Sequence, residues 1–132
     1  MPLAVRWPGA RFCDFGDSAD LSAHLLGLIR AGVKTATCGA LRDYQAAGDP
    51  VPRAGDVMIA RDHAGRPALV YELTEVVVRP FCEVPEDFAL AEGEGDFAAW
   101  RAGHQAYFAR NGGFAPDMPL VCERFRLVEV LA

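Results

Sequence analysis

The chain has 132 residues, of which 52% are hydrophobic and 23% are charged, and its formal net charge is −5. This length predicts one domain, residues 1–132, and the lack of an apolar run of about 18 residues argues against a membrane span. The acidic balance excludes the broad basic surface that grips long nucleic acids such as duplex DNA, but it allows a local cationic pocket for a nucleoside, a nucleotide or a short strand.

The first elements predicted along the chain are a short strand and an amphipathic helix. Residues 11–15 are interpreted as the strand and residues 16–32 as the helix. Asp17 or Ser18 caps this helix and Gly32 ends it. Its apolar side chains recur at helical spacing and comprise Leu21, Leu25, Leu28 and Ile29.

Shorter elements follow in the middle of the chain. Residues 35–38 are β-prone, and residues 41–48 predict a brief helix that leads into a turn rich in glycine and proline. Residues 57–62 and 67–81 are strand-forming and flank the tetrapeptide HAGR, so they predict a β-hairpin.

The last third of the chain predicts one helix and one strand. The helix begins near Asp96, and its aromatic face consists of Phe97, Trp100, His104, Tyr107 and Phe108. Residues 120–130 alternate between apolar and polar side chains and predict a closing strand. Because strands outnumber long helices and most pairings are expected to be antiparallel, the sequence predicts an α+β fold around a small, partly closed β-barrel.

Neither the cysteines nor the N-terminus indicates a metal site, a disulfide framework or secretion. The four cysteines are scattered, without a CxxC pair or a Cys/His cluster at zinc spacing: Cys13, Cys38, Cys82 and Cys122. Reduced, buried thiols are therefore expected, and no metal or other cofactor is predicted. The opening MPLAVRWPGA has neither the basic nor the apolar region of a secretory signal, so a cytoplasmic location is expected.

The stretch AGVKTATCG, residues 31–39, contains the strongest candidate for chemistry. Of the 13 lysine and arginine residues, only Lys34 is a lysine, and a lysine can lose its proton near neutral pH where an arginine cannot. Lys34 and Thr37 are three residues apart, which places them on opposite faces of a regular strand, so their cooperation requires a bend after Gly32. In a partly desolvated pocket Lys34 would become a base for the Thr37 hydroxyl; otherwise it is a solvated flank of an ordinary strand.

An ordered set of segments spread over nearly the whole chain resembles the ASCH domain family, and more closely its small stand-alone bacterial members. The segments are GVKTAT at 32–37, RAGD at 53–56, PFCEV at 80–84, FALAEGEGD at 88–96, WRAGH at 100–104 and VCERF at 121–125. The resemblance implies a PUA-like small β-barrel with flanking helices and a cleft suited to RNA or a nucleoside. Some members remove the acyl group from N4-acylcytidine, others have been assigned single-strand ribonuclease activity, and many are presumed RNA binders.

The resemblance also implies roles for individual residues. The lysine of the family corresponds to Lys34, its threonine nucleophile to Thr37, and its catalytic glutamate to Glu94, through the local pattern AEGE. Glu92 is the second choice for the glutamate and a candidate substrate-binding residue. Without a catalytic role, Glu94 would only stabilise the helix that follows it, through the helix dipole. His104 is interpreted as a packed histidine on an aromatic helix face.

One departure from the family pattern affects substrate binding. Many members carry an arginine two residues after the threonine, where this chain has Gly39. Arg42 or Arg101 is predicted to take over that function. Tyr44 and Phe81 are candidates for stacking on a base, although either could simply pack in the core.

Three hypotheses from different classes follow. The first is a hydrolase of the amide of an N4-acylcytidine-like nucleoside, in which Thr37 attacks the acyl carbonyl, Lys34 takes its proton, and Glu94 orients the lysine or protonates the leaving nitrogen. The second is a single-strand ribonuclease, and the third is a non-catalytic reader of RNA or of a modified nucleoside. The acidic pI of about 5.1 favours the first, with a nucleoside or short single-stranded RNA as partner.

Overall fold

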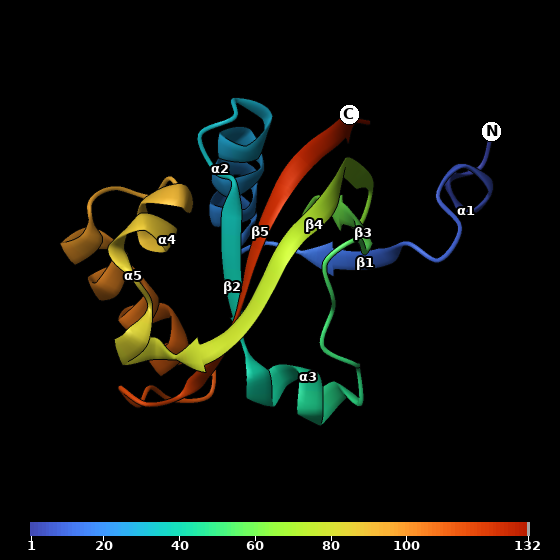
Figure 1. The fold of residues 1–132 in the computed structure, drawn as a ribbon. Coiled ribbons are helices and arrows are strands. Elements are labelled where there is room, and N and C mark those ends of the chain that lie inside the picture. Colours follow the sequence, from blue (N-terminus) through green and yellow to red (C-terminus); the bar gives the residue numbers. More distant parts are fainter. Residues whose placement is uncertain (132) are drawn as a thin grey trace.

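A computed structural model describes residues 1–131, which build one five-stranded sheet curved into a half-barrel (Figure 1). The strands are β1 (Arg11–Asp14), β2 (Ala36–Ala40), β3 (Val57–Arg61), β4 (Pro67–Pro80) and β5 (Pro119–Val130). Their order in the sheet is β1-β3-β4-β5-β2, with β1 parallel to β3 and the other pairs antiparallel. The short strands β1 and β2 are therefore the two edges of the sheet.

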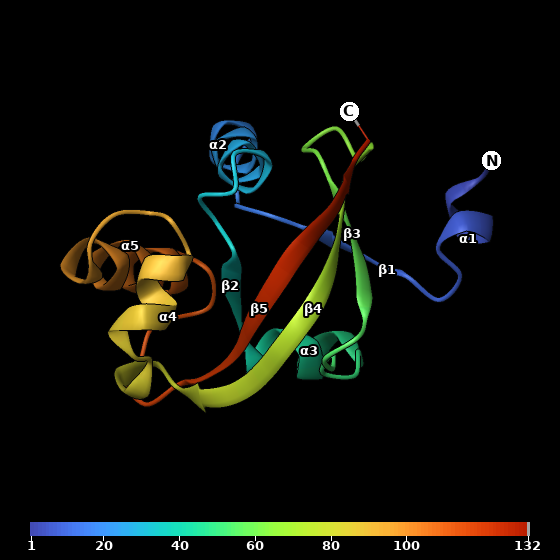
Figure 2. The ribbon, with the colours of Figure 1, turned by 45° about the horizontal axis from the view of Figure 1, so that its top comes forward.

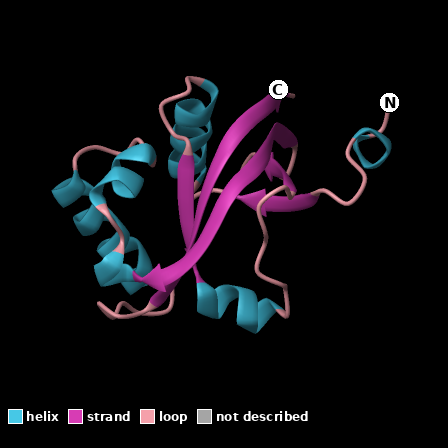
Figure 3. Ribbon diagram, viewed as in Figure 1, coloured by secondary structure: helices cyan, strands magenta, loops and turns pink. Residues whose placement is uncertain are grey.

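Helices surround this half-barrel on several sides (Figures 2 and 3). They are α1 (Leu3–Arg6), α2 (Ala19–Arg30), α3 (Leu41–Ala47), the 3₁₀ turn η1 (Phe81–Glu83), α4 (Glu86–Ala91) and α5 (Phe97–Arg110). α4 and α5 lie together beside β2, while α2 and α3 lie at opposite ends of that strand. Among residues 1–131, no helix is both long and apolar enough to cross a membrane.

The α+β, PUA-like barrel architecture predicted from the sequence is confirmed, and helix α2 shows why the local prediction succeeds. The Ser18 side chain accepts a hydrogen bond from the Leu21 backbone N–H at 3.2 Å, so Ser18 rather than Asp17 is the cap. Gly32 follows the helix with a φ of +75°, a conformation that glycine adopts without steric cost. This turn sets the direction in which the chain enters the segment before β2.

Three features differ from the sequence-based expectation. β2 begins at Ala36 and ends at Ala40, later than residues 35–38, because its bounds are set by pairing with β5. α4 has only six residues and lies in a segment for which the sequence predicts no helix, since so short a helix carries no clear periodicity. The parallel pairing of β1 with β3 joins residues about 47 positions apart, which no local pattern predicts.

Apolar side chains pack on both faces of the sheet, and β5 contributes to both cores. Phe125 belongs to the core beneath α2, whereas Leu120 and Cys122 belong to the core between the sheet and α4–α5. Because successive residues of a strand point to opposite faces, Glu123 shares the face of Phe125. The fold thus directs one carboxyl group of β5 toward the inside of the half-barrel.

Candidate functional site

A cavity of about 530 Å³ opens where the half-barrel fails to close, between the edge strands β1 and β2. Residues of both edges line it, together with side chains from α3, α5 and the segment after α4. Because β2 is an edge strand, side chains from both of its faces can border the same cavity. This volume is typical of a site for a small organic ligand.

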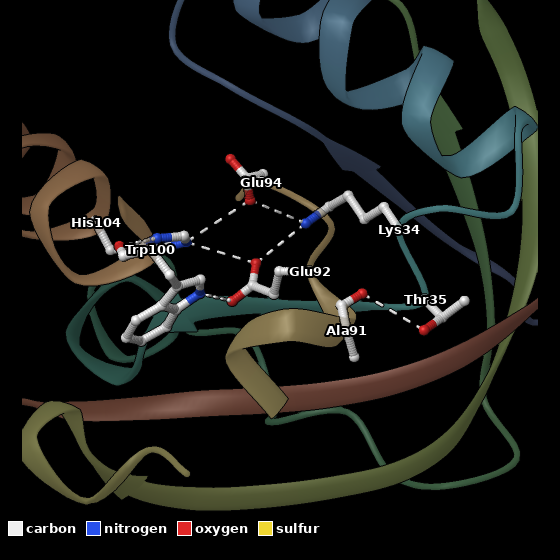
Figure 4. Close-up of polar contacts among 7 residues, drawn as sticks. All are labelled: Lys34, Thr35, Ala91, Glu92, Glu94, Trp100 and His104. Atoms are coloured by element: carbon white, nitrogen blue, oxygen red, sulfur yellow. Dashed lines mark hydrogen bonds and ion pairs between the residues drawn. The ribbon is translucent and has the colours of Figure 1, made fainter. Parts of the chain in front are cut away.

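Lys34 is the centre of a charged cluster at one end of this cavity (Figure 4). It lies between α2 and β2, and only 2% of its surface is exposed. Its Nζ donates to Glu92 Oε1 at 3.0 Å and to Glu94 Oε2 at 3.4 Å, and both glutamates follow α4. A buried ammonium requires such partners, because an unpaired buried charge is very costly.

Glu92 is the buried anion of this cluster. Trp100 Nε1 donates to its Oε2 at 2.8 Å, and His104 Nε2 lies 3.5 Å from its Oε1. Burial alone would raise the pKa of the carboxyl, but Lys34, His104 and Trp100 outweigh this effect and lower the pKa to about 2. Glu92 therefore remains ionised at every physiological pH.

His104 connects the two carboxylates of the cluster. Its ring stacks on Trp100 with a centroid distance of 4.4 Å, and its Nδ1 lies 2.9 Å from the Trp100 carbonyl oxygen. Its Nε2 also lies 4.0 Å from Glu94 Oε2. Although burial by itself lowers the histidine pKa, Glu92 and Glu94 raise it overall. Both ring nitrogens face oxygen acceptors, which favours the imidazolium form.

One group of described residues has ligand atoms close enough to hold a metal ion: Cys38, Glu92 and His104, within 4.8 Å of one another. A metal requires a deprotonated thiol and a neutral imidazole. Here burial raises the pKa of the Cys38 thiol well above its usual range, and the glutamates favour protonated His104. Lys34 Nζ already neutralises the Glu92 carboxylate, so the donor set suits this ammonium better than a metal.

The other end of the cavity carries a second buried glutamate, Glu123. It pairs directly with Thr37 across the β2–β5 ladder, and Tyr44 Oη donates to its Oε2 at 3.0 Å. Cys38 points toward Glu92, so the preceding Thr37 points to the opposite face of β2, the face of Glu123. Burial raises the pKa of Glu123 to about 7, although the Tyr44 hydrogen bond opposes this rise.

Five of the seven residues predicted for the site line this cavity: Lys34, Thr37, Tyr44, Glu92 and Glu94. Glu92 makes the shorter contact with Lys34, whereas Glu94 lies farther away with 25% of its side chain exposed. Within residues 1–131 no hydrogen bond joins Lys34 Nζ to Thr37. Lys34 Nζ instead contacts Glu92, on the side of β2 to which Cys38 points, although Lys34 and Thr37 both line the cavity.

The structure does not bring Arg42 and Arg101 to the cavity. The Arg42 guanidinium donates to the backbone carbonyls of Asn111 at 3.3 Å and Gly113 at 2.6 Å, which anchors the loop after α5. Arg101 is exposed and lies over the Phe97 ring at 4.6 Å. The arginine that lines the cavity is Arg110, on the last turn of α5.

Sequence reasoning did not assign a site role to His104, Cys38 or Glu123. For Glu123 a signal exists, because it occupies a position between Val121 and Phe125 on one face of the closing strand. A charged residue on an apolar face is the kind of exception that indicates a function or a specific partner. His104 is packed, as predicted, but it also contacts both carboxylates.

Comparison with known proteins identifies relatives of this fold and sequence. The family model of the ASCH domain matches residues 11–129. Protein EF3133 from Enterococcus faecalis V583 is 33% identical, with a TM-score of 0.82 over 92% of this chain and 77% of that chain. An ASCH domain from Lactobacillus crispatus JV V101 is 28% identical, with a TM-score of 0.82 over 95% and 83% of the two chains.

A third solved structure, the hypothetical protein PH0355, shares the fold alone. It is 14% identical, with a TM-score of 0.60 over 89% of this chain and 99% of that chain. A search of curated proteins finds no match.

Proposed function

This chain belongs to the ASCH domain family, and from that premise we propose that its cavity is the active site of a hydrolase that cleaves the amide of an N4-acylcytidine-like nucleoside. Family membership suggests an RNA-binding or hydrolase-like role. The observation that carries the narrower proposal is a buried lysine, Lys34, that shares one small-molecule cavity with the Thr37 hydroxyl and is held between Glu92 and Glu94.

In the proposed reaction, Thr37 Oγ1 attacks the acyl carbon while the neutral amine of Lys34 takes the hydroxyl proton. The bond between the acyl carbon and N4 then breaks, and the Lys34 ammonium returns the proton to the leaving nitrogen. This leaves cytidine and an acyl ester of Thr37. Water then attacks the ester while Lys34 takes a proton from it, and Lys34 returns this proton to the Thr37 oxygen. This step releases the carboxylic acid and restores the threonine hydroxyl.

The two carboxylates have different parts in this scheme. Glu92 is buried and ionised, and its contacts with Lys34 and Trp100 fix the position of the lysine. Glu94 is partly exposed and lies 3.4 Å from Lys34 Nζ. It is therefore the group that carries the resting ammonium proton toward solvent before Lys34 accepts the proton of Thr37. Glu92 and Glu94 thus act as positioning and proton-exchange residues around one base.

A single-strand ribonuclease is the second candidate function. The observation that favours it is His104, whose raised pKa and contacts with both glutamates would suit a general acid next to the Lys34 charge. A non-catalytic reader of RNA or of a modified nucleoside is the third. The net charge of −5 and the limited cavity volume favour a small ligand over a long strand.

The decisive experiment is incubation of the protein with a panel of N4-acylcytidines and with a single-stranded RNA oligonucleotide, followed by chromatography of the products. We expect cytidine to appear from at least one N4-acylcytidine and the RNA to remain intact. Cleavage of the RNA alone would establish the ribonuclease. No product from either substrate class would overturn the proposed hydrolase and favour the non-catalytic reader.

A further inference from the structure

We propose that Glu123 and Tyr44 form a base-recognition subsite within the cavity. This subsite reads a pyrimidine edge that carries a ring-nitrogen acceptor beside an exocyclic N–H, as cytosine does. The inference rests on the proposed function, because it names the groups that hold the base while Lys34 and Thr37 act on the acyl group.

The position of Glu123 relative to Thr37 supports separate roles, in which Glu123 holds the base and Thr37 acts on the acyl group. The two residues are direct partners across the antiparallel β2–β5 pair, and side chains of such partners stand on one face of the sheet with their Cβ atoms about 5 Å apart. In an N4-acylcytidine, the acyl carbon is bonded to N4, and N4 and N3 are bonded to the same ring carbon. A base that pairs with Glu123 through N3 and N4–H therefore brings its acyl carbon next to Thr37.

Glu123 has an incomplete set of hydrogen-bond partners. Only 4% of the residue is exposed, and within residues 1–131 its carboxyl group accepts one hydrogen bond, from Tyr44 Oη at 3.0 Å. Buried carboxyl oxygens in proteins normally have partners for both atoms. Because Glu123 lines the cavity, the unpartnered oxygen is available to a bound ligand.

The protonation state of Glu123 suits hydrogen bonding to the N3 and N4–H edge of the base. Burial raises its pKa to about 7, so a large share of the carboxyl is protonated at neutral pH. A protonated carboxyl donates one hydrogen bond and accepts another, which matches N3 and N4–H, whereas a carboxylate only accepts. The groups that act on this carboxyl from its surroundings are Tyr44 on α3, Arg11 on β1, Asp56 before β3 and Glu92 after α4. The nearby thiol and hydroxyl of Cys13 on β1 and Tyr71 on β4 hydrogen-bond to each other at 3.0 Å.

Substitution of Glu123 by alanine and by glutamine distinguishes recognition from other roles. The Kd of cytidine is measured by calorimetry, and kcat and KM are measured with N4-acetylcytidine. We expect Glu123→Ala to weaken cytidine binding roughly 10- to 100-fold, because polar atoms of the ligand lose a buried partner. Glu123→Gln keeps one donor and one acceptor, so it should recover most of the cytidine affinity that Glu123→Ala loses. Glu83→Gln, at an exposed glutamate, is the matched control.

Each remaining outcome has a defined meaning. Unchanged cytidine binding and KM in Glu123→Ala would overturn the subsite while leaving the hydrolase intact. A Glu123→Gln variant that binds cytidine normally but has lost kcat would assign Glu123 to proton transfer and overturn the recognition role. If the unchanged protein neither binds cytidine nor hydrolyses any N4-acylcytidine, both the proposed function and the subsite are overturned.

Discussion

Glu92 and Glu123 line the same cavity and are almost equally buried, with exposed fractions of 1% and 4%. Their pKa values nevertheless lie on opposite sides of the ordinary value of 4.5, at about 2 for Glu92 and about 7 for Glu123. The contacts of the two carboxyl groups account for the difference. Glu92 contacts Lys34 and His104, whereas within residues 1–131 the one hydrogen bond to the Glu123 carboxyl comes from a phenol.

This contrast shows that burial alone does not decide the charge of a carboxyl group; its partners do. It also distinguishes a charged end of the cavity around Lys34 from a neutral end around Glu123, whose direct partner across the β2–β5 pair is Thr37. Pairs of acids whose pKa values are driven apart by their surroundings commonly perform different tasks in one site. We assign proton transfer to the charged end and base recognition to the neutral end.

The largest effect is expected from Lys34→Arg, which tests the charged end. Arginine keeps the positive charge between the glutamates but cannot act as a base, so kcat for N4-acetylcytidine should fall by a factor on the order of 10² or more, with a smaller change in KM. Thr37→Ser keeps a hydroxyl and should retain partial activity. Full activity in a Lys34→Arg variant with an unchanged melting transition would show that this end supplies only charge.

A pair of stability measurements compares the two glutamates directly. Glu92→Gln leaves the Lys34 ammonium without its nearest counterion and should lower the free energy of unfolding by about 3–5 kcal/mol at pH 7. Glu123→Gln keeps the acceptor for Tyr44 and, among residues 1–131, removes no ion pair. Near pH 4.5, where the folded protein holds this carboxyl protonated, its effect should therefore stay within about 1 kcal/mol. Urea denaturation provides both values. Equal losses for the two variants would abolish the distinction between the ends.

The pH dependence of stability should differ in sign between the two glutamates. The pKa of Glu123 is raised from 4.5 to about 7, so its contribution is fully present below pH 4.5 and is lost as the pH rises through 7. The pKa of Glu92 is lowered to about 2, so its contribution is present above pH 4.5 and is lost as the pH falls through 2. Each window should amount to about 3–4 kcal/mol, since each pKa differs from 4.5 by about 2.5 units.

Difference curves of unfolding free energy against pH, between the unchanged protein and each glutamine variant, isolate the two windows. A Glu123→Gln curve parallel to that of the unchanged protein between pH 4.5 and 7 would contradict the raised pKa.

The smallest effect is expected from salt. A nucleoside carries no phosphate, so the Kd of cytidine should change less than about twofold between low and moderate ionic strength. Calorimetric titrations at several salt concentrations provide the test. The contrary result is a single-stranded RNA that binds more tightly than cytidine and loses affinity steeply with increasing salt. That result would shift the assignment toward a ligand with several phosphates.

The parts of the fold that follow from local chemistry could be predicted from the sequence. Ser18 and Gly32 mark the ends of α2, and HAGR separates two strand-forming segments that do pair. The pairing of β1 with β3 could not be predicted, because β1 has only four residues and its partner lies far along the chain. α4 was missed for a similar reason, since its six residues are stabilised mainly by packing of Phe88 and Ala89.

The site could be predicted only where a motif marks it. Lys34, Thr37 and the two glutamates stand in segments that resemble a family, and all four line the cavity. Glu123 was overlooked, because its importance depends on facing Thr37 across the β2–β5 pair. That relation can be known only from the register of the two strands. Arg42 and Arg101 were suggested only as replacements for the family arginine that is absent at Gly39. Their side chains lie outside the cavity because backbone carbonyls and an aromatic ring provide their partners elsewhere.

The most direct test of a Thr37-dependent amidohydrolase site is a time course of N4-acetylcytidine with the unchanged protein and with Thr37→Ala, analysed by chromatography and mass spectrometry. The unchanged protein should release cytidine and acetate in equal amounts, and the Thr37→Ala variant, with an intact melting transition, should release almost none. Equal release by the two proteins, or no release by either, would contradict the proposed active site.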